Sequence, residues 1–212
     1  MSPQGAMVAI LGALLLGVMS PGPSFIVVAR NSINLSRRAG LAAALGMGIG
    51  GVVFSGVALL GLFTLLAKVE WLYVCLKLAG GLYLVYLGYQ MWRGAASRLS
   101  FENLRGGAQT SALRSFRTGL TTQLSNPKAA IVYGSIFAAL LPQHPPAWCY
   151  AVLPPAVFGI EAGWYALVAV LFSSRAARES YASAKKLIDR IAATAITVLG
   201  FRLILTAHRA GI

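Results

Sequence analysis

The stretch LLLGVMSPGPSFIVV, residues 14–28, sets two prolines and a glycine inside an uncharged apolar segment. The surrounding span, residues 6–34, is longer than the roughly 20 apolar residues that a helix needs to cross the hydrocarbon core of a bilayer. Pro21 and Pro23 lack an amide hydrogen, and their rings clash with preceding carbonyl groups. The sequence therefore predicts a transmembrane helix that is broken at Ser20-Pro21-Gly22-Pro23-Ser24.

The composition extends this interpretation to the whole chain. Of the 212 residues, 58% are hydrophobic and 11% are charged, against about half and about a quarter in soluble domains. Residues 1–29, 39–67 and 129–160 contain no Asp, Glu, Lys or Arg. We therefore expect an all-α polytopic membrane protein rather than a soluble domain.

Charged residues and turn residues divide the chain into six predicted spans. Their boundaries are 6–34, 40–66, 71–92, 113–141, 148–172 and 187–207. Pro154 and Pro155 leave the start of the fifth span open, because prolines can begin a helix or kink it. The first span lacks the charged leading region of a signal peptide, so we expect it to remain as a transmembrane helix.

The net charge of +13 would favour nucleic acid as the partner of a soluble protein, but its distribution favours a membrane. Thirteen of the eighteen Lys and Arg residues lie at the first, third and fifth turns, whereas the second turn has only Lys68 and the C-terminal tail only Arg209. Cytoplasmic loops carry the excess of Lys and Arg. Both termini are therefore predicted to be periplasmic, and no nucleic acid partner is expected.

The longest polar stretch, residues 93–112, separates residues 1–92 from residues 113–212, and each half has three predicted spans. Because three is odd, the halves would have opposite orientations. The fourth span is interrupted by Ser125-Asn126-Pro127-Lys128, at a position that corresponds to the break in the first span. Matching interruptions in inverted halves indicate a transporter's midplane site. We predict two inverted three-helix repeats, joined by a cytoplasmic linker, with broken first and fourth helices.

Each break would leave a helix N-terminus inside the membrane, with free N–H groups and a partial positive charge that suit a carboxylate. Unwound backbone is tolerated at this depth only where it faces protein or water. The residues predicted to bind substrate are Ser20, Pro21, Gly22, Pro23, Ser24, Ser125, Asn126, Pro127 and Lys128. Two plain proline kinks without a ligand are the alternative.

We expect Glu161 to be the only acid inside the spans, in the middle third of the fifth, where a charged side chain costs at least about 2.5–3.5 kcal/mol. Such a group can carry a proton through a transport cycle, so Glu161 is the predicted proton-coupling residue. A static ion pair with Lys128, which lies at a similar predicted depth, is the alternative.

An intramembrane enzyme would need a nucleophile with its base, or a metal cluster, within the spans. His144 lies in the outer turn and His208 in the tail, and the chain has neither an HExxH nor a GxSxG motif. Cys75 and Cys149 form no CxxC motif or Cys/His cluster. We therefore expect no enzyme activity, no catalytic residues, no metal and no cofactor.

Further stretches accompany the Pro-Gly-Pro motif in a fixed order. They are RRAGLAAALG at 37–46, LKLAGGLYLVYLG at 76–88, FRTGL at 116–120 and SNPKA at 125–129. With these stretches the chain resembles the LysE/RhtB superfamily of bacterial amino acid exporters, of the homoserine/threonine efflux type. The resemblance implies a six-helix inner-membrane protein that performs secondary-active efflux of amino acids by proton antiport.

In such an exporter, the substrate carboxylate would lie on the broken-helix N-termini, and its amine near Glu161 or an unwound carbonyl. Because we place only one acid in the middle of a span, a neutral amino acid such as threonine or homoserine is favoured over Lys or Arg. The expected partners are the amino acid, the proton and the lipid bilayer, and a homo-oligomer remains open. Export of another small metabolite or cation, and a non-transporting accessory subunit, are the alternatives.

Overall fold

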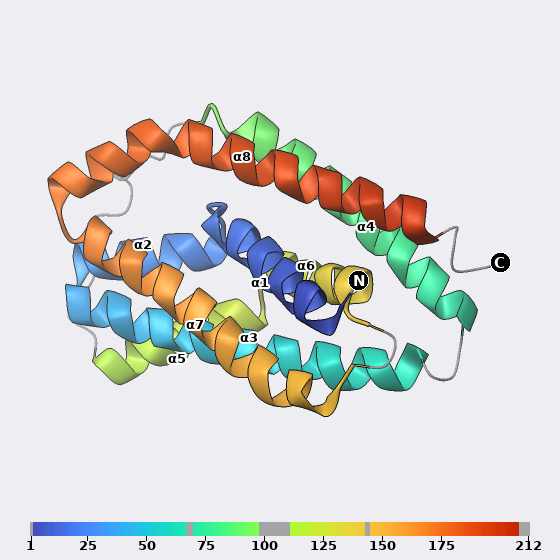
Figure 1. Ribbon diagram of the computed structural model, residues 1–212. Helices are drawn as coiled ribbons and strands as arrows, with labels where there is room; N and C mark the ends of the chain where they lie inside the picture. Colours follow the sequence, from blue (N-terminus) through green and yellow to red (C-terminus); the bar gives the residue numbers. More distant parts are fainter. Residues whose placement is uncertain (1, 67–69, 98–110, 143–144, 208–212) are drawn as a thin grey trace.

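The computed structural model describes residues 2–66, 70–97, 111–142 and 145–207, and these residues form eight helices and no strands (Figure 1). The all-α class is confirmed. The helices are α1 (Pro3–Met19), α2 (Pro23–Asn34), α3 (Arg37–Leu66), α4 (Glu70–Gly94), α5 (Ala112–Leu124), α6 (Pro127–Leu140), α7 (Ala147–Phe172) and α8 (Arg175–Ala207). Most of the predicted linker, residues 98–110, lies outside the described residues.

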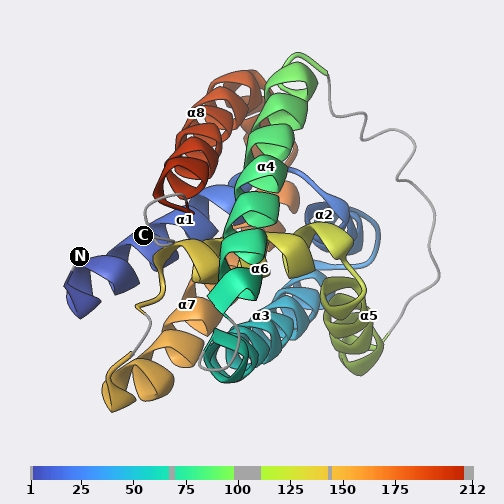
Figure 2. The ribbon, with the colours of Figure 1, turned by 90° about the vertical axis from the view of Figure 1, so that its right-hand side faces the viewer.

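Both predicted helix breaks are present. α1 ends at Met19, the backbone of Ser20 and Gly22 is extended, and α2 begins at Pro23, with a bend of 57° between the two helices. α5 ends at Leu124, and Asn126 caps the start of α6, which runs in a different direction from α5 (Figure 2). In each case a proline occupies the first turn of the new helix, where its missing N–H costs no helical hydrogen bond.

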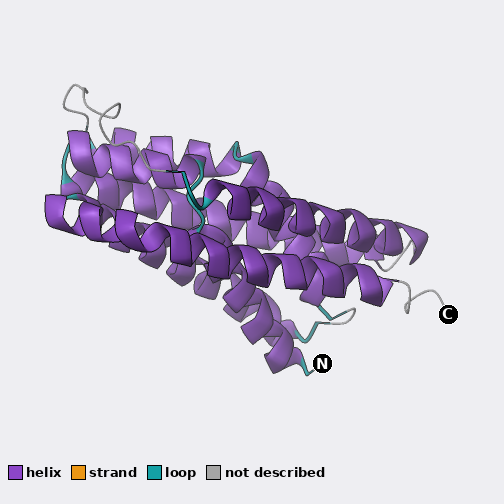
Figure 3. Cartoon of the chain, turned by 90° about the horizontal axis from the view of Figure 1, so that it is seen from above, coloured by secondary structure: helices purple, strands orange, loops and turns teal. Residues whose placement is uncertain are grey.

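The helices form three layers, and α1, α2 and α6 of the two broken helices lie in the middle one (Figures 1 and 2). The long helices α4 and α8 pack side by side on one face, and α3 packs against α7 and α5 on the other. Between them lie α1, α2 and α6. Seen from above, α1 begins and α8 ends toward the same end of the bundle (Figure 3). This arrangement buries Ser20 and Ser24 at the first break and Asn126 at the second.

Glycines allow two of these helix pairs to approach closely. A methyl group on Gly46 of α3 would overlap the carbonyl of Phe116, and one on Gly119 of α5 would overlap the carbonyl of Ala43. In the opposite layer, a Cβ added to Gly200 of α8 would lie 2.7 Å from the carbonyl oxygen of Gly81. Small residues at helix crossings are typical of membrane helices, because association there depends on close van der Waals packing.

The six predicted spans are supported only in part. The described stretches long and apolar enough to cross a membrane are Arg37–Gly61, Ala147–Phe172 and Glu179–Ala207, and the bent pair α1–α2 would be a fourth. The predicted fourth span is split between α5, which has 13 residues including two arginines, and α6, which has 14. Neither piece alone reaches the length of about 20 apolar residues that a crossing needs.

One predicted helix start differs from the structure, and the start of the fifth span, left open between 148 and 154, lies at Ala147. The sixth span was placed at 187, but α8 begins at Arg175, because residues 175–186 are rich in Ala, Arg and Lys, which favour a helix outside the hydrocarbon as well as inside it. Charge therefore marks the membrane boundary rather than the helix end. α7 begins at Ala147 and continues through Pro154 and Pro155, so those prolines do not begin the helix.

Candidate functional site

The two helix breaks contact each other through buried polar side chains. The Ser24 hydroxyl, in the first turn of α2, donates a hydrogen bond of 2.7 Å to Oε1 of Gln123 on α5. Nδ2 of Asn126 donates to the same hydroxyl at 3.0 Å. All three side chains are buried. Because Ser24 and Asn126 are 102 residues apart in the chain, this cluster joins the break of the first half to the break of the second.

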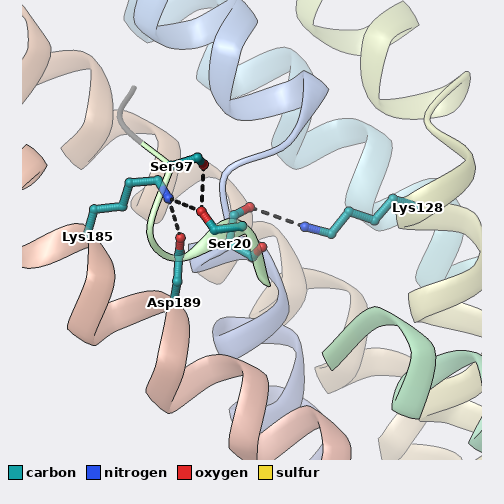
Figure 4. Close-up of polar contacts among 6 residues, drawn as sticks. Ser20, Ser97, Lys128, Lys185 and Asp189 are labelled. Carbon is teal, nitrogen blue, oxygen red and sulfur yellow. Dashed lines mark hydrogen bonds and ion pairs between the residues drawn. The ribbon is translucent and has the colours of Figure 1, made fainter. Parts of the chain in front are cut away.

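Lys128, which follows the second helix break, also contacts the first. Its Nζ donates to the main-chain carbonyl of Ser20 at 3.3 Å. This carbonyl belongs to the unwound chain after α1, whose Ser20 is extended rather than helical. Figure 4 shows Lys128 reaching this segment from one side while Lys185 and Asp189 lie on the other. The lysine thus contacts backbone that helix breakage has exposed.

The two helix N-termini created by the breaks are not equivalent. At α6, Oδ1 of Asn126 accepts hydrogen bonds from the N–H groups of Lys128 and Ala129, at 3.0 and 3.4 Å. At α2, the cap residue Gly22 has no side chain and makes no such bond. The α6 end is therefore already capped in the usual way, and α2 has the N-terminus that is more open to an anion.

Glu161 lies at the centre of the molecule, on α7, and is only 4% exposed. Its Oε1 accepts a hydrogen bond of 2.9 Å from the Tyr133 hydroxyl of α6. Its Oε2 has no hydrogen-bond partner in the part of the chain that the structure describes. Glu161 and Lys128 line one cavity, but Lys128 contacts Ser20 and Glu161 contacts Tyr133. These two described side chains therefore form no direct ion pair, which was the predicted alternative.

A small polar cavity separates these groups. It provides about 30 Å³ of space, enough for a water molecule and too little for an amino acid. Its polar lining includes Ser20, Ser24, Gln123, Asn126, Lys128, Tyr133, Glu161 and Tyr165. In this structure the central cluster is therefore assembled but closed. We call this space the central cavity.

A second, larger cavity lies beside the unwound Ser20–Gly22 segment and has a volume of about 340 Å³. It is bounded by the first turn of α2, the end of α4 and the first half of α8. Lys128 lines both cavities. We call this space the outer cavity, a name that refers to the helix bundle and not to a side of the membrane. Its size falls within the range of small-molecule sites.

The structure brings together most of the residues predicted to bind substrate. Ser20, Gly22, Ser24, Asn126, Lys128 and Glu161 line the central cavity, and Pro21 and Pro23 line the outer cavity. Ser125 and Pro127 line neither, since both are exposed at the α5–α6 turn. The Ser125 hydroxyl donates to the carbonyl of Thr121 at 2.6 Å. These two residues shape the turn instead of facing a cavity.

Several residues at the site were missed from the sequence. Gln123 and Tyr133 complete the central cluster, and Lys185 and Asp189 form a buried ion pair of 2.6 Å beside the outer cavity. Asp189 falls within the predicted sixth span, so Glu161 is not the only buried acid. The spacing of Lys185 and Asp189, four residues apart on a helix, was the available signal.

Comparison with known proteins identifies similar chains. A family model described as LysE type translocator matches residues 15–207. Two relatives carry the name threonine efflux protein: one from Salmonella typhi is 36% identical over 206 residues, and one from Escherichia coli K12 is 35% identical over 203, each covering 91% of this chain and 94% of the relative. An uncharacterised membrane protein of Haemophilus influenzae is 30% identical, covering 88% and 90%. No solved structure matches.

Proposed function

Since the chain belongs to the LysE type translocator family, whose members are membrane transporters and not enzymes, we propose that it exports amino acids across the bacterial inner membrane in exchange for protons. The predicted resemblance to this family is confirmed by the match over residues 15–207. The observation that carries the proposal is the meeting of two helix breaks around a buried carboxylate, Glu161, and a partly buried amine, Lys128.

The proposed fold is six crossings in two inverted repeats. One repeat comprises the broken pair α1–α2 with α3 and α4, and the other comprises the broken pair α5–α6 with α7 and α8. Support comes from the packing, because α3 contacts α7 and α4 contacts α8, so that equivalent helices of the two halves pair with each other. α1 also contacts α6, and α2 contacts α5. Such exchanged pairs are expected when two repeats are related by a pseudo-two-fold axis.

In the transport site, the substrate carboxylate would lie against the N-terminus of α2 and Nζ of Lys128. The lysine already donates to the Ser20 carbonyl and has further donors to offer, because an ammonium carries three. The substrate ammonium would lie near Glu161, whose Oε2 has no partner among the described residues. The cluster would have to widen to admit a substrate, since the central cavity holds about 30 Å³.

Charge balance favours an amino acid with a neutral side chain. The two cavities together contain the side chains of Lys128, Lys185, Glu161 and Asp189, whose formal charges cancel. A zwitterion with a neutral side chain adds no net charge, whereas Lys or Arg would add a buried positive charge at high cost. The named relatives are threonine efflux proteins. We therefore propose a neutral amino acid such as threonine or homoserine as substrate.

Counterflow with purified protein tests this function. Proteoliposomes preloaded with unlabelled L-threonine or L-homoserine should take up the corresponding radiolabelled amino acid, and empty liposomes should not. The same measurement with lysine, arginine and metabolites that are not amino acids defines the class of substrate. Exchange of another metabolite or cation without any amino acid would replace the proposed substrate, and a lack of exchange across the panel would favour an accessory subunit.

We further propose that both termini are periplasmic and that the linker around residues 93–112 is cytoplasmic, since the charged turns after α2, α4 and α7 would then face the cytoplasm. A Cys introduced at Gly107, in a background with Cys75 and Cys149 replaced by Ser, should resist an impermeant thiol reagent in intact cells and react in inverted membrane vesicles. The replacement is required because both native cysteines are free. Labelling of intact cells would reverse the orientation.

A further inference from the structure

The outer cavity contains a charged pair that the proposed transport site does not use. Lys185 and Asp189, one turn apart on α8, are 5% and 3% exposed. Nζ of Lys185 donates to Oδ2 of Asp189 at 2.6 Å and to the Gly94 carbonyl at 3.1 Å. The lysine therefore caps the end of α4 and is paired with an acid, which explains its burial.

The aspartate is only half satisfied. Its Oδ1 is buried and has no hydrogen-bond partner among the described residues, although Asp189 lines the outer cavity. A buried carboxylate oxygen without a donor is costly. A packing role explains Oδ2, which binds Lys185, but leaves Oδ1 unexplained. Because this oxygen is shielded from the cavity, a cationic donor would reach it only after the cavity lining moves.

The cavity also offers a group for the other end of a zwitterion. Lys128 lines it across the unwound segment from Asp189 (Figure 4), and so do Ser20 and Gly22. One cavity of about 340 Å³ is thus lined by the residue that carries the unsatisfied carboxylate oxygen, by Lys128 and by the N-terminus of α2. An amino acid carries the complementary pair of charges on two groups bonded to the same carbon atom.

We infer that the outer cavity is a second substrate subsite, in which Asp189 binds the ammonium group of an amino acid while Lys128 binds its carboxylate. The inference rests on the proposed amino acid export. Because Lys128 lines both cavities, the carboxylate can stay on this lysine while the ammonium moves from Asp189 to Glu161. The subsite lies beside the end of α4, which leads into the charged linker, and beside the first half of α8. Under the proposed orientation these segments are on the cytoplasmic side, where export begins.

The test compares two competitors that differ only at the amine. Counterflow of radiolabelled L-threonine is measured in the presence of one of two competitors. One is unlabelled L-threonine, and the other is 2,3-dihydroxybutanoate, in which a hydroxyl replaces the ammonium group. In the unsubstituted protein the amine-free compound should compete at least about tenfold more weakly, since it leaves buried carboxylates unpaired. In Asp189→Asn this ratio should fall several-fold. The matched control Glu179→Gln removes an exposed carboxylate from the same helix and should keep the ratio.

A ratio of two competitors does not depend on how much protein folds, so a purely structural role of Asp189 would leave it unchanged. If Asp189→Asn does not fold, a double variant with Lys185→Met and Asp189→Leu replaces the whole ion pair by apolar residues. Proteins often tolerate such a replacement of a buried ion pair. The ratio should fall in this variant as well. An unchanged ratio in a folded variant that transports threonine would overturn the subsite and leave the exporter intact. Absence of any amino acid exchange by the unsubstituted protein would instead overturn the proposed function.

Discussion

Replacing Gly22 with Leu should abolish amino acid exchange, while replacing it with Ala should preserve it. A Cβ at this position would lie 3.6 Å from Cδ and 3.6 Å from Nζ of Lys128, which is ordinary van der Waals contact. The further atoms of Leu would enter the space that Lys128 and the substrate carboxylate share. We expect the initial rate of counterflow to fall at least about a hundredfold, which corresponds to about 2.7 kcal/mol.

The same substitution should leave the fold intact. Gly22 has φ −149° and ψ −169°, an extended conformation that any residue can adopt, so the backbone is not strained by a side chain. It caps α2 without a side-chain hydrogen bond, so no cap is lost. Melting temperature and monodispersity in detergent should match those of Gly22→Ala. Threonine exchange by Gly22→Leu with unaltered affinity would remove this segment from the transport site.

Local chemistry made the helix breaks predictable from the sequence. Proline fixes its own backbone and removes a donor wherever the chain folds, so the interruptions at Pro21 and Pro127 follow without knowledge of packing. The uncharged blocks likewise indicate a membrane protein, because the cost of burying charge in hydrocarbon does not depend on the fold. Features that depend on one or two adjacent residues were therefore recovered.

The partners of the site residues were not predictable in this way. Ser24 meets Gln123 only because α2 of the middle layer packs against α5 of the adjacent layer, and no spacing within the chain encodes that contact. The Tyr133 hydroxyl of α6 reaches Glu161 of α7 although these two helices pack little against each other. Helix register and crossing geometry, which depend on the whole set of packed side chains, decide these meetings.

Asp189 illustrates a different limit. We assigned the charges near residue 190 to the cytoplasmic turn, because Lys and Arg dominate that stretch. The structure instead buries Asp189 with Lys185 against the end of α4. A pair four residues apart on a helix can neutralise itself and become buried, and counting charges one at a time does not detect this. The preference for a neutral substrate therefore depends on the charges of the two cavities, which cancel, and not on the presence of a single acid within the spans.

The second large effect is expected at Glu161. If this carboxylate carries the exchanged proton, Glu161→Gln should lose accumulation driven by a pH gradient and keep threonine counterflow. The Gln amide oxygen can still accept the hydrogen bond from Tyr133, but the side chain cannot bind and release a proton. Proteoliposomes with and without a pH gradient should then reach the same internal threonine concentration, whereas the unsubstituted protein should accumulate threonine only with the gradient.

Two matched variants separate this role from a structural brace. Tyr133→Phe removes the hydrogen bond of 2.9 Å to Glu161 but keeps the titratable carboxylate, so gradient-driven accumulation should persist. Glu161→Gln combined with Lys128→Met removes the charges of both side chains. A brace of opposite charges would make each single substitution destabilising by about 3–5 kcal/mol and the double one much less so. Because Lys128 contacts the Ser20 carbonyl and not Glu161, we expect no such recovery of stability. Full gradient-driven transport by the double variant would show that Glu161 does not carry the proton.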